Sequence, residues 1–144
     1  MKTAGSWTET IGFSVAAFGF FLPFFHYGFF GGVLGIQLTV LPFEALNNAP
    51  PILAWLAAFA IFTLPAMAAV AGLVYRRIAS WNRPLIGLLF AAAGFVGLGS
   101  ANFSPTTIRW DWGYYVVEAG FLIAAAGAAM RWVGRPRVDV RNAN

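Results

Sequence analysis

Residues 52–75 form a stretch without a single charged side chain. About 20 consecutive apolar residues are enough for an α-helix to cross the hydrocarbon core of a membrane, and this stretch is longer than that. Inside a bilayer, the backbone N–H and C=O groups must find their partners within the protein, which a helix provides. The stretch therefore predicts a membrane-spanning helix and restricts the folds that the rest of the chain can adopt.

Three further apolar runs accompany this one. Hydrophobic residues make up 60% of the chain and charged residues only 10%, whereas a soluble domain has about 25% charged residues. With 144 residues, the chain has no room for a second globular domain of typical size beside these runs. We expect one membrane domain over 1–144 with an all-α, antiparallel bundle of four transmembrane helices. The expected spans are 11–27, 52–75, 85–101 and 113–132, followed by a tail at 133–144.

The basic residues predict the orientation of this bundle. They cluster between the second and third runs and around the end of the fourth, while the other two links carry few charges. Because positively charged loops stay in the cytoplasm, both termini and the central link are expected on the cytoplasmic side of a cell (inner) membrane. The arginines expected to set this topology and to contact lipid headgroups are Arg76, Arg77, Arg83, Arg131, Arg135 and Arg137.

Two segments on the opposite side of the membrane are too apolar and aromatic for ordinary solvated loops. They comprise residues 28–51 and 102–115. Within the first of them, residues 36–40 alternate between apolar and polar side chains, and a period of two is typical of a β-strand. We therefore expect the two segments to form a small extracytoplasmic cap that contains a short strand at 36–40.

Glycines recur seven residues apart in three of the four runs, which returns each pair to nearly the same helix face. Small residues let helices approach closely in lipid, where dispersion replaces the hydrophobic driving force. Such faces either join copies of the protein or pack helices within one bundle, and the second interpretation is favoured because four helices need these faces in any case. The glycines are Gly12, Gly19, Gly87, Gly94, Gly120 and Gly127.

A carboxylate interrupts the fourth run at Glu118. Ionisable groups are costly in a membrane and are paired or functional when they occur there. The favoured interpretation is a polar residue satisfied by a tyrosine, Asn102 or Arg109 under the cap, and the alternatives are a contact with another subunit and an ion or proton site. Because two residues turn a helix by about 200°, Gly120 lies nearly opposite Glu118. If the glycine face packs against the protein's own helices, we expect Glu118 to point away from them.

The residue types of most active sites are scarce in this chain. Cysteine is absent, which excludes thiolate catalysis, disulfides and thiolate metal sites. His26 is the only histidine, and we expect it to lie among interfacial aromatic residues; the alternative is a ligand of a haem, a pigment or a quinone. The net charge of +4 is explained by the topology arginines, so no nucleic-acid partner is expected. The sequence thus predicts a protein that is not an enzyme and that has no resident cofactor or metal.

Three stretches carry a resemblance to known proteins, at 22–25, 35–39 and 112–128. They resemble corresponding stretches of uncharacterised bacterial four-helix (tetraspan) inner-membrane proteins, which implies the fold and no activity. We expect a scaffold or accessory subunit that packs in a larger membrane assembly or homo-oligomer, with lipids, other membrane subunits or copies of itself as partners. The alternatives are a small channel or carrier oligomer that uses Glu118, and a cofactor- or quinone-binding electron-transfer subunit.

Overall fold

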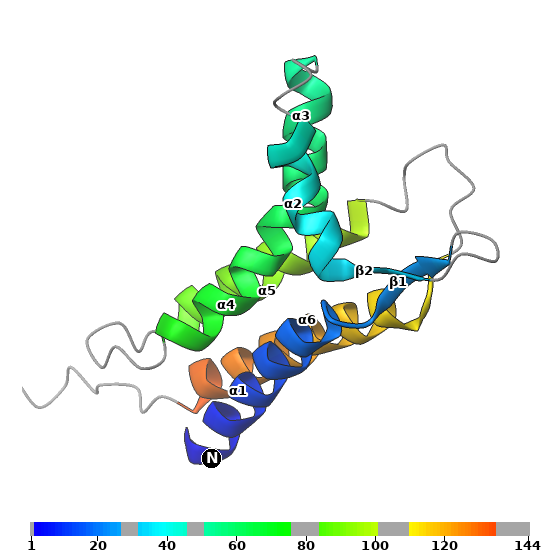
Figure 1. Ribbon diagram of the computed structural model, residues 1–144. Helices are drawn as coiled ribbons and strands as arrows, with labels where there is room; N and C mark the ends of the chain where they lie inside the picture. Colours follow the sequence, from blue (N-terminus) through cyan, green and yellow to red (C-terminus); the bar gives the residue numbers. More distant parts are fainter. Residues whose placement is uncertain (1, 27–31, 46–50, 76–83, 101–109, 135–144) are drawn as a thin grey trace, which may run out of the picture.

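The computed structural model describes residues 2–26, 32–45, 51–75, 84–100 and 110–134, and these are mostly helical (Figure 1). The helices are α1 (Lys2–Gly19), α2 (Gly35–Ala45), α3 (Ile52–Ala58), the π-helix η2 (Phe59–Thr63), α4 (Leu64–Tyr75), α5 (Pro84–Gly99) and α6 (Trp112–Val133). Strands β1 (Pro23–His26) and β2 (Gly32–Leu34) pair antiparallel in a two-stranded sheet.

Two of the described helices are long and apolar enough to cross a membrane. They are Ile52–Tyr75, which α3, η2 and α4 form together, and α6. Helix α5 is apolar but shorter. The first helix differs most from the expected 11–27, because it begins at Lys2 and ends at Gly19. Pro23 has no N–H to continue a helical ladder and disfavours a helical conformation in the residue before it, so the chain turns and enters β1 instead.

Helices α1 and α6 lie side by side and run in opposite directions (Figure 1). Their contact runs along small residues, with Gly12 of α1 against Ala124 of α6 and Gly19 against Val117. A Cβ atom on Gly12 would lie only 2.7 Å from the carbonyl oxygen of Gly120, so the two backbones touch. The small-residue face of each helix thus brings the first and last helices of the chain together.

Helices α4 and α5 form a second antiparallel pair that packs against the first. Fully buried side chains fill the space between the pairs, and they include Phe13 of α1, Leu98 of α5, and Tyr114 and Phe121 of α6. The start of α1, the end of α4, the start of α5 and the end of α6 all meet at one end of this arrangement, as the contacts described below show. We call this the Glu9 end.

A π-helical segment bends the longest helix in its middle. At η2 the N–H of Leu64 bonds the carbonyl of Phe59, five residues earlier, and Pro65 follows directly. Proline has no N–H to donate, and π-helical turns and prolines are two established causes of sharp helix kinks. In Figure 1, α3 consequently points away from the line of α4 and from the α1 and α6 pair.

The strand expected at 36–40 is wrong, because these residues belong to helix α2. The buried positions of α2 follow helical spacing, with Leu38, Thr39 and Pro42 on the inner side. Ile36 and Val40 are 38% and 45% exposed. Apolar residues cover the outside of this protein as well as its core, so their alternation did not mark a buried strand face. The described strands nearby are instead β1, which precedes residue 28, and β2, which precedes α2.

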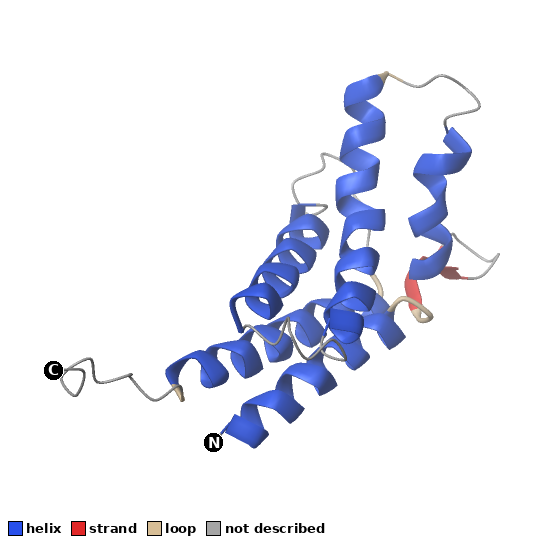
Figure 2. Ribbon diagram, turned by 90° about the vertical axis from the view of Figure 1, so that its left-hand side faces the viewer, coloured by secondary structure: helices blue, strands red, loops and turns tan. Residues whose placement is uncertain are grey.

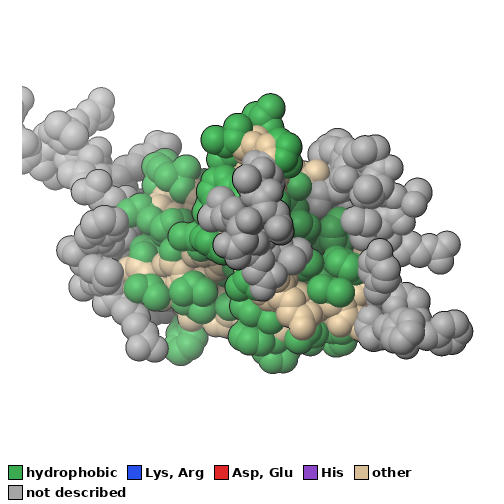
Figure 3. All heavy atoms as spheres, turned by 45° about the horizontal axis from the view of Figure 1, so that its top comes forward, with side chains coloured by type: hydrophobic (Ala, Val, Ile, Leu, Met, Phe, Trp, Pro, Cys, Tyr) green, Lys and Arg blue, Asp and Glu red, His purple; other side chains and the backbone are tan. Residues whose placement is uncertain are grey.

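The outer surface of the described helices is apolar. On the face drawn in Figure 3, hydrophobic side chains cover most of the described surface. The charged residues whose side chains the structure describes are Glu9, Asp111, Glu118 and Arg131, and each of these four is buried or half-buried. Large exposed side chains are instead apolar, such as Ile11, Phe18 and Leu89.

Candidate functional site

The most deeply buried charge in the described helices is the carboxylate of Glu9, in α1. The side chain of Glu9 has no exposed surface. One of its oxygens forms an ion pair with the guanidinium of Arg131 in α6 and accepts a hydrogen bond from it. The other oxygen accepts a hydrogen bond from the hydroxyl of Tyr75 in α4. We call these three residues the Glu9 cluster, and it joins three helices at the Glu9 end.

Glycines on two helices make room for this cluster. A Cβ atom on Gly87 of α5 would collide with the carboxylate of Glu9 and with the hydroxyl of Tyr75. A Cβ atom on Gly127 of α6 would lie 2.8 Å from the Cβ of Glu9. The fourth helix, α5, therefore contributes space instead of a polar group, and any larger residue at Gly87 would displace the carboxylate.

The electrostatics of the cluster explain why its members occur together. A single charge taken out of water costs several kcal/mol, and a partner with good hydrogen bonds offsets most of that cost. Both carboxylate oxygens of Glu9 have a hydrogen-bond donor. The positive charge of Arg131 is also stabilised by the negative end of the helix dipole, because Arg131 lies in the last turn of α6. The arrangement is that of a satisfied structural ion pair.

The position of Arg131 differs from the sequence expectation. We expected Arg131 to contact lipid headgroups, but it is only 9% exposed and is turned toward Glu9. The cost of leaving Glu9 unpaired in the core exceeds the gain from one more headgroup contact, which is about 1 kcal/mol. The other five topology arginines, Arg76, Arg77, Arg83, Arg135 and Arg137, lie outside the described residues.

Sequence reasoning missed Glu9 and Tyr75, although a signal for the first was present. Helical spacing places Glu9 in line with Gly12, and it places Arg131 in line with Gly127. Both charges therefore continue the small-residue faces that were already expected to pack. Tyr75 was not connected with these faces, because the run 52–75 has no pair of glycines seven residues apart.

Glu118 forms a second, smaller polar contact in α6. The hydroxyl of Tyr114, one helical turn earlier, donates to Glu118 Oε1 at 2.5 Å and lies 3.5 Å from the carbonyl oxygen of Leu98. Tyr114 is fully buried, and Glu118 is half-buried. Among the partners that the sequence suggested, the structure thus provides a tyrosine, whereas Asn102 and Arg109 lie outside the described residues.

The direction of Glu118 corrects the expectation that it points away from the other helices of the chain. A Cβ atom on Gly99, at the end of α5, would lie 3.8 Å from Glu118 Oε1. Helix α6 has neighbours on two of its faces, since its glycine face meets α1 and another face meets α5. The carboxylate therefore faces the protein's own α5.

Apolar layers separate the Glu9 cluster from the contact of Glu118. Along α6, Phe121 and Ala124 lie between Glu118 and Arg131, and both are fully buried. Phe13 of α1 fills the same region and is also fully buried. The two polar contacts therefore lie at different depths of the helix arrangement, with packed aromatic rings between them.

The six glycines expected to pack helices are all buried against other helices of the same chain. Gly12, Gly19, Gly120 and Gly127 lie at the contact of α1 with α6, and Gly87 lies against the Glu9 cluster. Gly94 of α5 lies against the ring of Phe121. These contacts are internal to one chain, as packing within a bundle requires.

His26 ends strand β1, where its backbone pairs with Gly32, and its side chain is not among those described. Its neighbour Phe25 contacts Trp110, and the N–H of Asp111 bonds the carbonyl of Phe24, so β1 covers the entry of α6. Within the described part of the chain, no three His, Asp or Glu side chains are grouped closely enough to hold a metal ion.

The helical fold fits a membrane protein in general. Two described helices have the length and composition to cross a membrane. Comparison of the chain with models of protein families, with curated proteins and with solved structures gave no match.

Proposed function

We propose that this protein is a non-enzymatic integral membrane protein that serves as a scaffold or accessory subunit. One observation carries this proposal: the charged side chains that the structure describes are bonded inside the chain. Glu9 binds Arg131 and Tyr75, Glu118 binds Tyr114, and Asp111 accepts a hydrogen bond from the N–H of Trp112. A catalyst or carrier directs such groups toward a substrate, whereas here the Glu9 cluster connects three helices, and Glu118 and Asp111 are bonded within α6 or at its start.

The apolar exterior supports the membrane part of the proposal. Lipid tails and the apolar faces of other subunits both accept exposed side chains such as Ile11, Phe18 and Leu89, which in water would form an unfavourable surface. In this proposal α1, the helix Ile52–Tyr75, α5 and α6 are the four spans. The Glu9 end then lies toward the cytoplasm, because the topology arginines flank the helices there.

The carrier alternative receives less support. A path for an ion along the helix arrangement would have to pass the buried rings of Phe13 and Phe121, which are packed against Gly72 and Gly94. The carboxylate of Glu118 is already bonded to Tyr114, one turn away on the same helix. Both features stabilise a closed, packed interior.

Purification from native membranes in a mild detergent tests the proposed function. We expect a particle larger than one chain with its detergent, containing either several copies or a stoichiometric second membrane protein. A single-chain particle that conducts ions or moves a solute after reconstitution into liposomes would overturn the proposal.

The topology is tested separately with reporter domains fused at the C-terminus and inserted after Asn47. We expect the C-terminal reporter to be cytoplasmic and the other to be on the opposite side of the membrane. An extracytoplasmic C-terminal reporter would refute the proposed orientation. A chain recovered in the soluble fraction would refute the membrane location itself.

A further inference from the structure

Exposed Trp and Tyr side chains in the described helices gather at the two ends of the α1 and α6 pair. Trp112 and Tyr115, at the start of α6, are each 57% exposed. Trp132, at the end of α6, is 50% exposed, and Trp7, in the first half of α1, is 70% exposed. All other large exposed hydrophobic side chains in the part of the chain that the structure describes are Ile, Leu, Val, Met or Phe.

The contacts of α1 with α6 place Trp7 at the same end as Trp132. A Cβ atom on Gly5, close to Trp7 in α1, would lie 2.9 Å from the carbonyl oxygen of Gly127 and 3.0 Å from the Cγ atom of Arg131. Arg131 directly precedes Trp132. In two perpendicular views the start of α1 lies beside the end of α6 (Figure 1 and Figure 2). Each end of this helix pair therefore carries its own group of exposed Trp or Tyr side chains.

The two groups are as far apart as the two faces of the hydrocarbon core of a bilayer. Helix α6 has 22 residues, and at 1.5 Å per residue Trp112 lies about 30 Å from Trp132. The hydrocarbon core is about 30 Å thick. Trp and Tyr are enriched at both membrane interfaces, where their rings remain in an apolar layer and their N–H or O–H groups reach polar headgroups. We therefore call the two groups the aromatic belts, one with Trp112 and Tyr115 and the other with Trp7 and Trp132.

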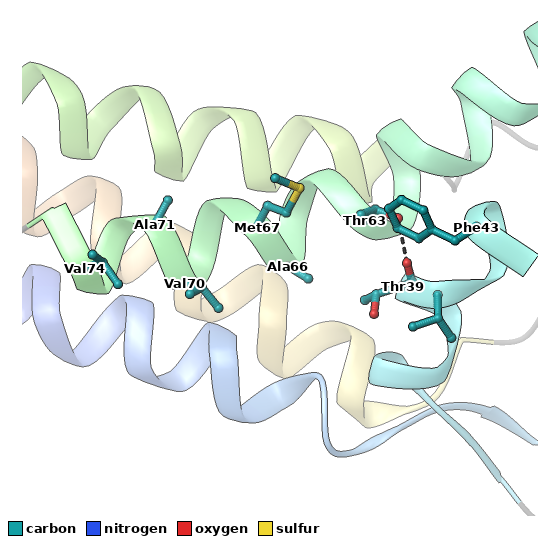
Figure 4. A pocket seen from close by; sticks show the side chains of 9 residues that line it. Thr39, Phe43, Thr63, Ala66, Met67, Val70, Ala71 and Val74 are labelled. Carbon is teal, nitrogen blue, oxygen red and sulfur yellow. Dashed lines mark hydrogen bonds between the residues drawn. The ribbon is translucent and has the colours of Figure 1, made fainter.

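Between the belts the large exposed side chains are apolar and carry no N–H or O–H group. On α1 and α6 they include Ile11, Leu122 and Ile123. Helix α4, which contacts α1, continues this surface with Met67 and Val70 along an open groove (Figure 4). The hydrocarbon core of a bilayer accepts such side chains, whereas Trp and Tyr are favoured at its two borders.

The order of these side chains favours lipid over a protein partner. In protein interfaces the residues that carry most of the binding energy are enriched in Trp and Tyr and cluster near the centre of the contact. Here the middle of the surface carries aliphatic residues, and Trp and Tyr lie at both of its borders. Contact with lipid accounts for two aromatic borders separated by the thickness of a bilayer.

We propose that the α1 and α6 pair crosses one bilayer with its exposed side chains in contact with lipid, and that the two aromatic belts mark the membrane interfaces. The proposal rests on the proposed membrane location and adds the depth of each residue. Leu122 then lies near the middle of the hydrocarbon core, about 15 Å from either end of α6. The Glu9 cluster lies at the level of one interface, because Arg131 is the neighbour of Trp132.

Spin labels at three positions on one side of α6 test this depth. Tyr115, Leu122 and Val133 are exposed and lie in line, about two and about three helical turns apart. The chain contains no cysteine, so Tyr115→Cys, Leu122→Cys and Val133→Cys each provide a single site for a nitroxide label. Trp7→Cys extends the test to α1. Each labelled protein is reconstituted in phosphatidylcholine vesicles, and its exposure to oxygen, which concentrates in the hydrocarbon core, is compared with its exposure to a water-soluble nickel chelate.

We expect the label at Leu122→Cys to contact oxygen more than the nickel chelate, and the labels at the other three positions to show the reverse. The depths should differ by about 10 Å between Tyr115→Cys and Leu122→Cys, and by about 16 Å between Leu122→Cys and Val133→Cys. Trp112→Cys and Trp132→Cys replace the two end variants of α6 should either fail to accumulate. Equal ratios at all positions, or a label at Leu122→Cys that the nickel chelate reaches more than oxygen does, would overturn the proposal.

A third result would identify a different neighbour of this surface. If neither reagent reaches the label at Leu122→Cys, another protein chain covers the middle of the surface and the lipid-contact proposal is wrong. The proposed membrane location stands in either case provided that the variants remain in the membrane fraction. Recovery of the wild type in the soluble fraction would remove both proposals together.

Discussion

The carboxylate of Glu9, in the second turn of α1, is bound by the guanidinium of Arg131 in the last turn of α6, 122 residues later in the chain. Around this pair the two helices meet on small residues such as Gly12 and Gly127. Any shift along the helices would leave both charges unpaired in an apolar environment. The pair therefore fixes the register of α1 against α6, and Tyr75 extends this constraint to α4.

Breaking the pair from one side should destabilise the protein strongly. In Arg131→Met the carboxylate of Glu9 remains buried without its cation, and in Glu9→Leu the guanidinium remains without its anion. Each change is expected to lower the free energy of unfolding by about 3–5 kcal/mol. Titration of the purified protein with a denaturing detergent, followed by circular dichroism, measures this loss.

The double variant Glu9→Leu, Arg131→Met is the control for charge. It removes both charges and should recover most of the loss, since an apolar pair of similar volume is often neutral or stabilising. Losses in the double variant equal to the sum of the single losses would show that the two side chains act independently, contrary to the observed contact.

The closest backbone contact of the bundle should not tolerate a single methyl group. A Cβ on Gly12 would collide with the backbone of Ala124, which cannot move aside as a flexible side chain can. We expect Gly12→Ala to lower the free energy of unfolding by about 1–3 kcal/mol, as overpacking does. Gly99→Ala is the matched control, because its Cβ would meet only Glu118 Oε1, at 3.8 Å.

The control should unfold at the same denaturant concentration as the wild type or slightly above it. Equal stability of Gly12→Ala and Gly99→Ala would mean that α1 and α6 lie farther apart than the structure places them.

Composition and periodicity were sufficient to predict the helices of membrane length and the glycines that lie at helix contacts. The stretch 52–75 and the stretch at 113–132 lie within membrane-length helices, and the glycines lie at helix contacts. The strand at 36–40 was misjudged because apolar residues also cover the outer surface of this protein. An apolar side chain therefore does not indicate a buried position here. The first helix was placed too late in the chain because only the apolar run from residue 11 was taken as the span, whereas α1 also includes the more polar residues from Lys2 onward.

The candidate site shows a different limit of the sequence. Glu9, Tyr75 and Arg131 come from three separate helices, and their meeting depends on the rotation and register of each helix. A pattern along one helix shows which residues share a face, but it does not show which neighbour that face meets. For the same reason the direction of Glu118 was wrong, since only the structure shows that α5 covers this side of α6.

The position of α2 should depend on two hydrogen bonds to the kinked helix. The indole N–H of Trp55 donates to the carbonyl of Pro42 at 2.8 Å, and the hydroxyl of Thr63 donates to the carbonyl of Thr39 at 2.8 Å. We expect Thr63→Val to cost about 1–3 kcal/mol because it leaves a buried carbonyl without its donor. Hydrogen exchange should then rise in α2 and remain unchanged in α1 and α6.

Thr8→Val is the control, because the hydroxyl of Thr8 bonds the carbonyl of Ala4 within α1 and at an exposed site. A rise in exchange over the whole protein in Thr63→Val would show that α2 is part of the global fold instead of a separately docked element.

Glu118 provides the test that separates the scaffold from the carrier. In Glu118→Gln the amide oxygen still accepts the hydroxyl hydrogen of Tyr114, so the free energy of unfolding should change by no more than about 1 kcal/mol. In Glu118→Leu the acceptor at 2.5 Å is lost from a fully buried tyrosine, and a loss of about 1–3 kcal/mol is expected. Tyr114→Phe combined with Glu118→Leu should recover part of that loss, because the donor is removed together with its acceptor.

Proton and ion flux is measured in parallel with the same variants in liposomes. The scaffold proposal predicts no flux above that of empty liposomes for the wild type and for each variant. Flux through the wild type that Glu118→Gln abolishes, at unchanged stability, would show that the charge and not the hydrogen bond matters, and the protein would then have to be regarded as a carrier.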